Sequence, residues 1–390
     1  MKIRRVLGRL GLAFAAVVAG RIAWHFAARD DANAVVDGRA EENLVARRNY
    51  LAAHVEQAAG ALAPDEQFSG EWSLVTLSMT SIAAANVGFE HSDTVPADLA
   101  VVTQCVELAR RPASRAFDAK RWGDDPLDAM SGAGSHIGYL GHLGLMLESY
   151  RLLGGRDPEL AGLEAKVVAA LAERVGAAND GLAPTYPNET YVADNAVVLA
   201  ALALADVGRG AHASGDATRG RGPHADLLAS TLATWKKTLV DPSTGVLVFG
   251  PGELAKPRAS GAALSAMMLA YVDEPFAEAQ GKALAAHFDD RVFDLFPALC
   301  EHPDCRGDGD GDVDSGPLVR GASPSATGFA LALAKRSHDA VRLGDGLATA
   351  EWAGLGFSWG GKRRYLLAPL VGDAVVLAAM SARAWDVRYL

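Results

Sequence analysis

Carboxylate, imidazole and phenol side chains recur where polar stretches of this sequence lead into apolar, helix-forming stretches. The stretch at 185–195 carries Tyr186, Asn188, Glu189, Asp194 and Asn195. A carboxylate that leads an apolar helix is expensive to bury without a partner or a function. Helix capping and the helix dipole account well for Glu189 but less well for Asp194. We therefore predict that Asp194 or Glu189 is a catalytic acid or base, and that the tyrosine and the two asparagines bind substrate.

A second polar stretch, at residues 135–142, contains two histidines and a tyrosine spaced three residues apart. These are His136, Tyr139 and His142. Side chains three apart are neighbours on a helix, and imidazole and phenol groups transfer protons near neutral pH. We expect Tyr139 and His142 to orient the substrate during catalysis and His136 to bind it. The alternative is that hydrogen bonds within a crowded core satisfy these groups.

Arg258 lies in a third polar loop, residues 256–261, which leads into another apolar segment. Its planar guanidinium suits two-point binding of a carboxylate, either on a ligand or on one of the acidic residues above. We predict a substrate-binding role for Arg258, with an ordinary surface salt bridge as the alternative.

A fourth stretch is a glycine-rich loop with alternating aspartates. These are Asp308, Asp310, Asp312 and Asp314. Such a loop can wrap calcium, although Val313 and Val319 occupy the glycine and glutamate positions of an EF-hand. We favour a split in which Asp312 binds substrate and Asp314 completes a catalytic pair, with no metal or other cofactor. Calcium held by the four aspartates is the alternative.

The cysteines allow two further interpretations. Cys300 and Cys305 are close enough in sequence to form a disulfide in an oxidising compartment, which would leave Cys105 as a small buried residue. Together with His302 the same two cysteines offer three ligands to zinc, one fewer than a closed structural site needs.

The elements that must position these groups are predicted to be helices, because Ala and Leu dominate over β-branched and aromatic residues. Clusters of turn residues separate the predicted helices. We expect them at residues 40–60, 70–87, 97–111, 125–153, 158–176, 190–208, 223–239, 259–271, 275–289, 324–337 and 367–385, with a short twelfth at 346–353.

Two of these segments differ in how polar they are. Residues 190–208 are apolar nearly all round, as in a helix packed on every side, whereas residues 160–175 carry their charges on one stripe. Unequal spacing between hairpins favours a closed ring over an open repeat array. We therefore predict an all-α (α/α)6 toroid over residues 41–390. The first turns of its inner helices would meet at one open end and form a funnel.

Residues 1–28 are predicted to target the chain to a membrane. Four basic residues precede an apolar run that begins at Leu10. Charge of this sign before the run places residues 29–390 on the periplasmic side of an inner membrane, anchored through residues 6–28 and joined to the toroid by a tether at 29–40. A signal peptide cleaved near Ala32-Asn33-Ala34 and a first helix of a cytosolic protein are the alternatives.

Charge and missing motifs exclude several classes of protein. The formal net charge is −10, and no basic cluster follows the N-terminus, so the sequence predicts no nucleic-acid partner. We find no nucleophile elbow, phosphate-binding Walker loop, dinucleotide fingerprint or His-Glu-x-x-His zinc helix. A small molecule is the expected partner, and the sequence does not specify an oligomeric state.

Three of the segments described above together resemble the linalool dehydratase/isomerase-like family. They are Tyr139-Leu140-Gly141-His142-Leu143, the Tyr186-Pro187-Asn188-Glu189 loop and the pair Asp194-Asn195. The resemblance spans residues 125–385. It implies an (α/α)6 toroid that adds or removes water at terpene alcohols without a metal or organic cofactor. The family places two cysteines beside this loop, where the present sequence has Asn188 and Asp194.

The leading hypothesis is therefore a lyase or isomerase that performs acid/base chemistry in the funnel on a small, neutral, partly apolar substrate resembling a terpenoid. A glycoside hydrolase or epimerase would use the same carboxylates, with Trp72, Trp122 and Trp352 at the rim. A non-catalytic, membrane-anchored scaffold is the third possibility. Paired carboxylates in one pocket would favour either enzyme over the scaffold.

Overall fold

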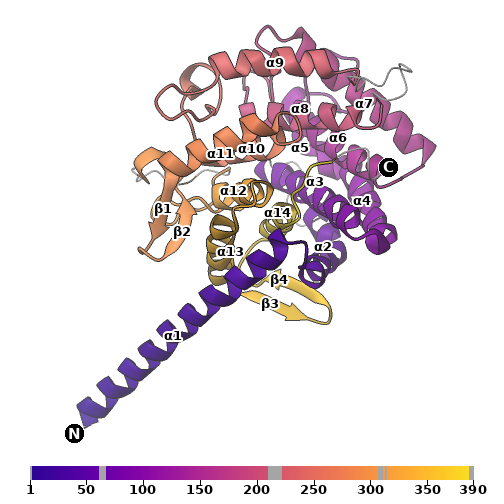
Figure 1. Cartoon of the computed structure of the whole chain (residues 1–390). Coiled ribbons are helices and arrows are strands. Elements are labelled where there is room, and N and C mark those ends of the chain that lie inside the picture. Colours follow the sequence, from indigo (N-terminus) through magenta and orange to yellow (C-terminus); the bar gives the residue numbers. More distant parts are fainter. Residues whose placement is uncertain (1, 61–66, 210–221, 306–310, 312–313, 386–390) are drawn as a thin grey trace.

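The computed structural model describes residues 2–60, 67–209, 222–305, 311 and 314–385. Over this part of the chain the protein is mostly helical, and its only strands form two short hairpins (Figure 1). The predicted all-α class is therefore confirmed.

Six helices form the centre of the molecule. They are α3 (Gln67–Glu90), α6 (Ile137–Leu152), α8 (Val192–Asp206), α10 (Ala259–Leu269), α12 (Pro324–Arg336) and α14 (Leu370–Met380). Each contacts the next in this order, and α14 contacts α3, so the order of contacts is closed. Most residues of α8, α10 and α14 are buried, as expected of helices that are apolar nearly all round.

A second set of helices packs outside the first. It comprises α2 (Glu41–Gly60), α4 (Val95–Ala109), α7 (Pro158–Ala177), α9 (Ala225–Thr238), α11 (Glu274–Phe288) and α13 (Ala340–Gly354), with the additional helix α5 (Pro112–Trp122). Inner and outer helices alternate along the chain from α2 to α14, apart from α5. Aspartate side chains cap the starts of three outer helices: Asp157 on α7, Asp273 on α11 and Asp339 on α13.

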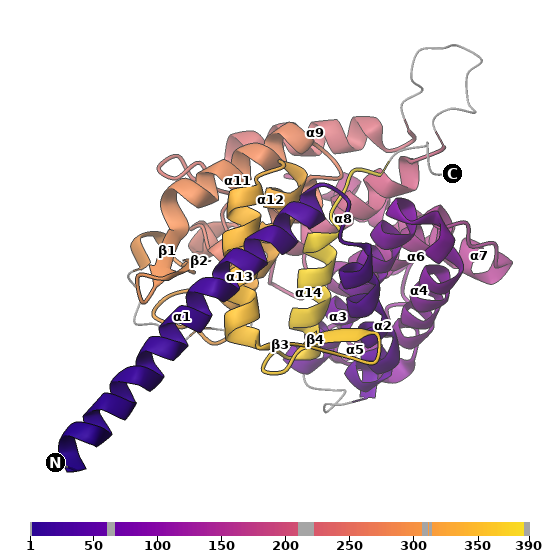
Figure 2. The same ribbon diagram turned by 60° about the horizontal axis from the view of Figure 1, so that its bottom comes forward.

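Both hairpins join an outer helix to the following inner one. Strands β1 (Asp289–Val292) and β2 (Phe296–Leu299) follow α11, and strands β3 (Gly356–Trp359) and β4 (Lys362–Tyr365) follow α13. Figure 2 shows one hairpin on each side of the C-terminal end of α13. The helical turns η1 (Ser92–Thr94), η3 (Gly252–Leu254) and η4 (Pro303–Cys305) lie in other connections.

Three predicted boundaries were wrong, and helix α5 was not predicted. Residues 123–136 form a loop rather than the start of a long helix, because Gly123 takes φ 93° after α5 and Pro126, Gly132 and Gly134 follow. The expected short helix at 346–353 is the longer α13, which Asp339 starts. The expected tether at 29–40 is helical as far as Val36.

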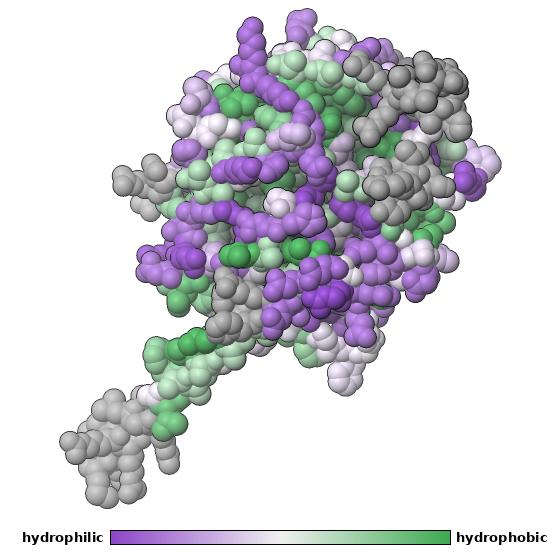
Figure 3. Space-filling view, in the orientation of Figure 1, coloured by the Kyte–Doolittle hydropathy of each residue, from purple (hydrophilic) through white to green (hydrophobic). Residues whose placement is uncertain are grey.

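Helix α1 (Lys2–Val36) therefore joins the body of the protein directly. It packs along α13, and Ala32 and Val35 are fully or almost fully buried. Lys335, near the end of α12, donates a hydrogen bond to the Val35 carbonyl oxygen. The N-terminal part of α1 leaves the body and carries exposed apolar side chains such as Phe14 and Val17 (Figure 3).

Among the described residues, one helix is long and apolar enough to cross a membrane. That helix is α3, while the apolar piece Phe14–Trp24 of α1 is shorter. Since α3 is packed between α2, α4, α6 and α14, its apolar character fits a core helix.

The predicted disulfide is present between Cys300 and Cys305, whose Cα atoms are 5.2 Å apart. It closes the connection after β2 and uses both thiols. The zinc alternative is therefore wrong, because neither cysteine remains as a thiolate ligand. Cys105 is a buried free thiol, as predicted.

Candidate functional site

A cavity of about 130 Å³ lies where several inner helices begin. The first turns of α3, α6, α8 and α10 line it, together with Phe329 of α12 and Asp314 of the preceding loop. Six aromatic side chains contribute to the wall: Phe68, Trp72, Tyr186, Tyr191, Phe249 and Phe329. Phe68 and Asp314 are also exposed at the molecular surface, so the cavity opens there.

Glu71, in the second turn of α3, is the carboxylate that the sequence interpretation missed. The Tyr186 hydroxyl donates a hydrogen bond to it, and Gln67 Nε2 donates another over 3.0 Å. Burial raises the pKa of Glu71, and the Tyr186 hydrogen bond opposes this shift. The signal was available, because Glu71 begins an apolar helix in the same way as Asp194.

Asp194 lies in the first turn of α8 and lines the same cavity. The Thr185 hydroxyl donates a hydrogen bond of 2.9 Å to its Oδ2 atom. Burial, followed by the charge of Glu71, raises the pKa of Asp194 to about 7. Asp194 therefore changes protonation near neutral pH.

His142, in the second turn of α6, also lines the cavity. Its Nδ1 atom lies 2.7 Å from the Ser78 hydroxyl oxygen of α3. Burial lowers the pKa of His142 to about 4, so the imidazole is neutral at physiological pH. A neutral imidazole can orient a substrate hydroxyl by donating or accepting a hydrogen bond.

Glu189 belongs to the rim rather than to the cavity lining. Its carboxylate pairs with Arg121 and accepts a hydrogen bond of 3.1 Å from the Tyr191 hydroxyl. Arg121 also lies over the ring of Tyr186, 4.8 Å from its centroid. Asn188, predicted to bind substrate, is exposed in the Tyr186–Glu189 turn with φ 65° and does not line the cavity. Of the 185–195 stretch, Tyr186, Tyr191, Ala193 and Asp194 line the cavity.

Asn195, predicted to bind substrate, lies in the core and does not line the cavity. It is fully buried, and its side-chain amide bonds to the backbone of Ala183 through both of its polar atoms, at 2.9 and 3.0 Å. Its Nδ2 atom also donates to the Tyr191 carbonyl oxygen. These bonds hold the loop before α8 against the helix, so Asn195 positions this loop.

His136 and Tyr139 do not share the cavity face with His142. Tyr139 is buried and donates a hydrogen bond of 3.0 Å to the Ala109 carbonyl oxygen on α4. His136 precedes α6 with φ 51° and is fully buried. The hydrogen-bonded core alternative describes both residues.

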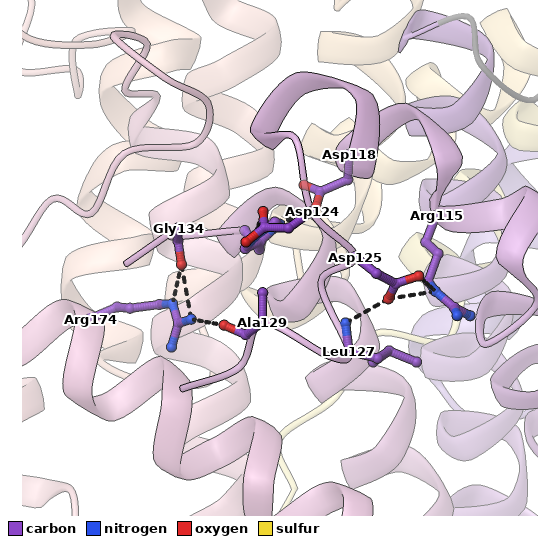
Figure 4. A network of polar contacts seen from close by, with 9 residues as sticks. Arg115, Asp118, Asp124, Asp125, Leu127, Ala129, Gly134 and Arg174 are labelled. Atoms are coloured by element: carbon purple, nitrogen blue, oxygen red, sulfur yellow. Dashed lines mark hydrogen bonds and ion pairs between the residues drawn. The ribbon is translucent and has the colours of Figure 1, made fainter. Parts of the chain in front are cut away.

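His136 belongs to a polar network that fixes the 123–136 loop (Figure 4). Its ring nitrogens lie 2.5 Å from an Asp118 oxygen and 3.1 Å from an Asp124 oxygen. Arg115 pairs with Asp125 over 2.6 Å, and Arg174 donates to the Gly134 carbonyl oxygen. This network explains how a loop with several helix breakers is held against α5 and α7.

Arg258 and two of the three candidate tryptophans also lie outside the cavity lining. Arg258 Nε donates to Glu301 over 3.0 Å, and its guanidinium lies 4.6 Å from the Phe249 ring centroid. Trp122 contacts His136, and Trp352 stacks on Phe296. Only Trp72 of the three lines the cavity. Arg258 therefore forms an ion pair with a buried glutamate that the sequence analysis did not name.

The aspartate-rich loop is described in part. Asp314 lines the cavity, and its carbonyl oxygen accepts a hydrogen bond of 2.5 Å from the Ser325 hydroxyl. Asp308, Asp310 and Asp312 lie outside the described residues, as does any calcium site that they would form.

The comparisons with known proteins assign no family to this chain. No protein-family model matches it, and no curated protein sequence matches it significantly. The resemblance to the linalool dehydratase/isomerase-like family therefore stays a prediction from short segments.

Proposed function

We propose that this protein is an (α/α)6 toroid enzyme of the lyase or isomerase type, which performs cofactor-independent acid/base chemistry on a small, neutral, partly apolar substrate. The observation that carries the proposal is the pairing of Glu71 and Asp194 in one cavity with aromatic walls. The closed order of contacts among the six inner helices supports the toroid.

The two carboxyl groups are suited to opposite roles. Asp194 has a pKa of about 7 and accepts its hydrogen bond from the neutral Thr185 hydroxyl, so it serves as the acid. Glu71 accepts hydrogen bonds from Tyr186 and Gln67, which favour its ionised form, so it serves as the base. Two carboxyl groups in different surroundings can hold opposite protonation states at one pH.

In the dehydration direction, Asp194 gives its proton to the hydroxyl oxygen of an alcohol while the carbon–oxygen bond breaks and water leaves. Glu71 takes a proton from the adjacent carbon, and that C–H electron pair becomes the new double bond. Asp194 ends as the anion and Glu71 as the acid, and proton exchange with cavity water restores both. His142 and Asp314 lie on the same cavity and would orient the substrate hydroxyl.

A second candidate is a carbohydrate-active enzyme. Trp72, Tyr186 and Tyr191 lie beside the same carboxyl groups, and stacked aromatic rings are typical of sugar sites. Hydrolysis or epimerisation of a glycan would use Asp194 and Glu71 without a cofactor.

We further propose that α1 anchors the protein on the periplasmic side of an inner membrane. The basic N-terminus followed by exposed apolar residues such as Leu12 and Phe14 supports an anchor. The Cys300–Cys305 disulfide supports an oxidising compartment.

The experiment is a turnover assay of the full-length protein in detergent against two panels, allylic terpene alcohols and reducing-end-labelled oligosaccharides. Asp194→Asn and Glu71→Gln are each expected to reduce turnover by at least about 100-fold, the usual scale of general acid/base catalysis. Glu278→Gln removes a carboxylate paired with Lys282 on the surface of α11 and serves as the matched control. Turnover by Asp194→Asn equal to that of Glu278→Gln would refute the assignment.

A further inference from the structure

Exposed apolar side chains are distributed unevenly between the two ends of the helix set. Outside α1, the described residues include eleven large hydrophobic side chains that are exposed. They are Phe68, Leu254, Phe293, Leu295, Val319, Val341, Leu355, Phe357, Trp359, Leu366 and Leu367. All but Val341 lie in a segment that joins an outer helix to the next inner helix, or in the first turn of α3.

We call the end formed by these segments the mouth end, because the inner helices that line the cavity begin there. The opposite end carries short turns, among them the aspartate caps of α7, α11 and α13, and a longer connection between α8 and α9 of which residues 210–221 lie outside the described part. Within the described residues it exposes one large apolar side chain, Val341. Exposed apolar residues concentrated at one end of a protein point to a surface that something covers.

The course of α1 points to what covers the mouth end. Near Val35 the helix contacts Lys335 at the far end of α12, whereas Gly20 and Trp24 lie beside Gly356 and Ser358 of the β3 strand. Helix α1 therefore runs toward the mouth end along α13 and leaves the body between the two hairpins (Figures 1 and 2). The exposed apolar residues Leu12, Phe14, Val17 and Val18 lie beyond this exit.

The hairpin tips on either side of the exit have the composition of membrane-interface segments. Trp359 is 79% exposed beside the Gly360-Gly361 turn, and Lys362 follows it. Leu295 is 67% exposed in the other turn, where Asp294 separates it from the exposed Phe293. Tryptophan and phenylalanine are favoured where apolar and aqueous phases meet, and lysine beside them suits anionic headgroups.

We propose that the mouth end rests on a lipid bilayer through the β1–β2 and β3–β4 hairpins, and that the cavity takes its substrate from that bilayer. Delivery of substrate from the bilayer rests on the proposed function, and it defines the substrate class of the enzyme as an apolar alcohol dissolved in the membrane. Phe68 belongs to both surfaces, because it is exposed at the mouth end and lines the cavity. It marks an apolar path between lipid and the carboxyl pair.

The membrane contact is tested without any substrate. Full-length protein is reconstituted in vesicles of phosphatidylethanolamine and phosphatidylglycerol that contain headgroup-nitroxide lipid. A fluorophore is attached through Leu295→Cys or, as the matched control, through Val341→Cys, which is 61% exposed at the opposite end. The native cysteines do not compete, because one is buried and two are bonded to each other.

The nitroxide is expected to quench the label at position 295 several-fold more than the label at 341. Equal quenching at both positions, or none at 295, would overturn the membrane contact. Protection of position 295 from a water-soluble quencher without nitroxide quenching would also overturn it, since a protein partner would then cover the surface.

The substrate class is tested separately by turnover. Trp359→Ser is expected to lower turnover of a long-chain allylic alcohol dissolved in the vesicles while leaving turnover of a short, water-soluble analogue unchanged. Equal loss on both substrates would contradict delivery from the membrane. No turnover of either substrate, together with the expected quenching, would refute the proposed function while the membrane contact stands.

Discussion

The hydroxyl of Tyr186 donates a hydrogen bond to the carboxylate of Glu71, a residue 115 positions earlier in the chain. This bond joins the loop before α8 to the start of α3 along the wall of the cavity. It makes the protonation of Glu71 depend on a residue that sequence distance would never connect to it.

Replacement of Tyr186 is expected to shift the pH dependence of turnover. The hydrogen bond from Tyr186 lowers the pKa of Glu71 against the effect of burial, so Tyr186→Phe should raise that pKa further. Since the proposed base must be ionised, the acid limb of the kcat/KM profile should move to higher pH. A profile that keeps its acid limb while kcat falls would assign Tyr186 a positioning role alone.

Asp194 is expected to make stability depend on pH. Its pKa is raised from 3.8 to about 7, so the folded state binds the proton more tightly and stability falls as pH rises across that range. Asp194→Asn should therefore stabilise the protein by about 4 kcal/mol above pH 7 and by little below pH 4. Urea unfolding at both extremes measures the difference, and an equal effect of the substitution at both would contradict it.

His142 is expected to act in the opposite direction. Burial lowers its pKa from 6.5 to about 4, so the unfolded state binds the proton more tightly and stability falls as pH drops through that interval. His142→Gln should remove this part of the acid sensitivity in thermal melting. His338→Gln, at an exposed position, is the control and should melt with the same pH dependence as the natural sequence.

Arg47 is expected to be essential for stability. It is buried on α2, where it donates to Glu351 of α13 over 2.7 Å and to the Tyr365 hydroxyl over 3.0 Å. Arg47→Met would leave Glu351 buried with less compensation, at a cost of about 3 to 5 kcal/mol. Lys282→Met, which breaks the exposed pair with Glu278, should cost less than about 0.5 kcal/mol. Chemical denaturation of both variants tests this contrast.

The helices were largely predictable from the sequence because each is bounded by turn residues and has a consistent apolar pattern. The predicted helix at 125–153 began too early, because it included the polar loop that precedes the apolar helix α6. Pro126, Gly132 and Gly134 were the available breakers. The β1–β2 and β3–β4 hairpins were not predicted, since strands of four residues carry too short a pattern to detect.

The candidate site was predictable only in part. Asp194, His142, Tyr186 and Asp314 do line one cavity, because the first two lie within the first two turns of inner helices and the other two in loops that lead into such helices. Asn195, His136 and Tyr139 are also polar but are buried, where Asn195 bonds to the loop before α8, Tyr139 to α4 and His136 to Asp118. Glu71 shows that the rule about carboxylates at helix starts needed to be applied to every apolar helix, including α3.

The burial of Ala32 and Val35 against the body has a consequence for maturation of the chain. The small-residue motif at 32–34 lies within the last turns of α1, and processing enzymes require an extended, accessible peptide. Excision at that motif would also strip a covering turn from α13 and uncover apolar surface. We therefore expect the folded protein to retain α1 as part of its packed structure.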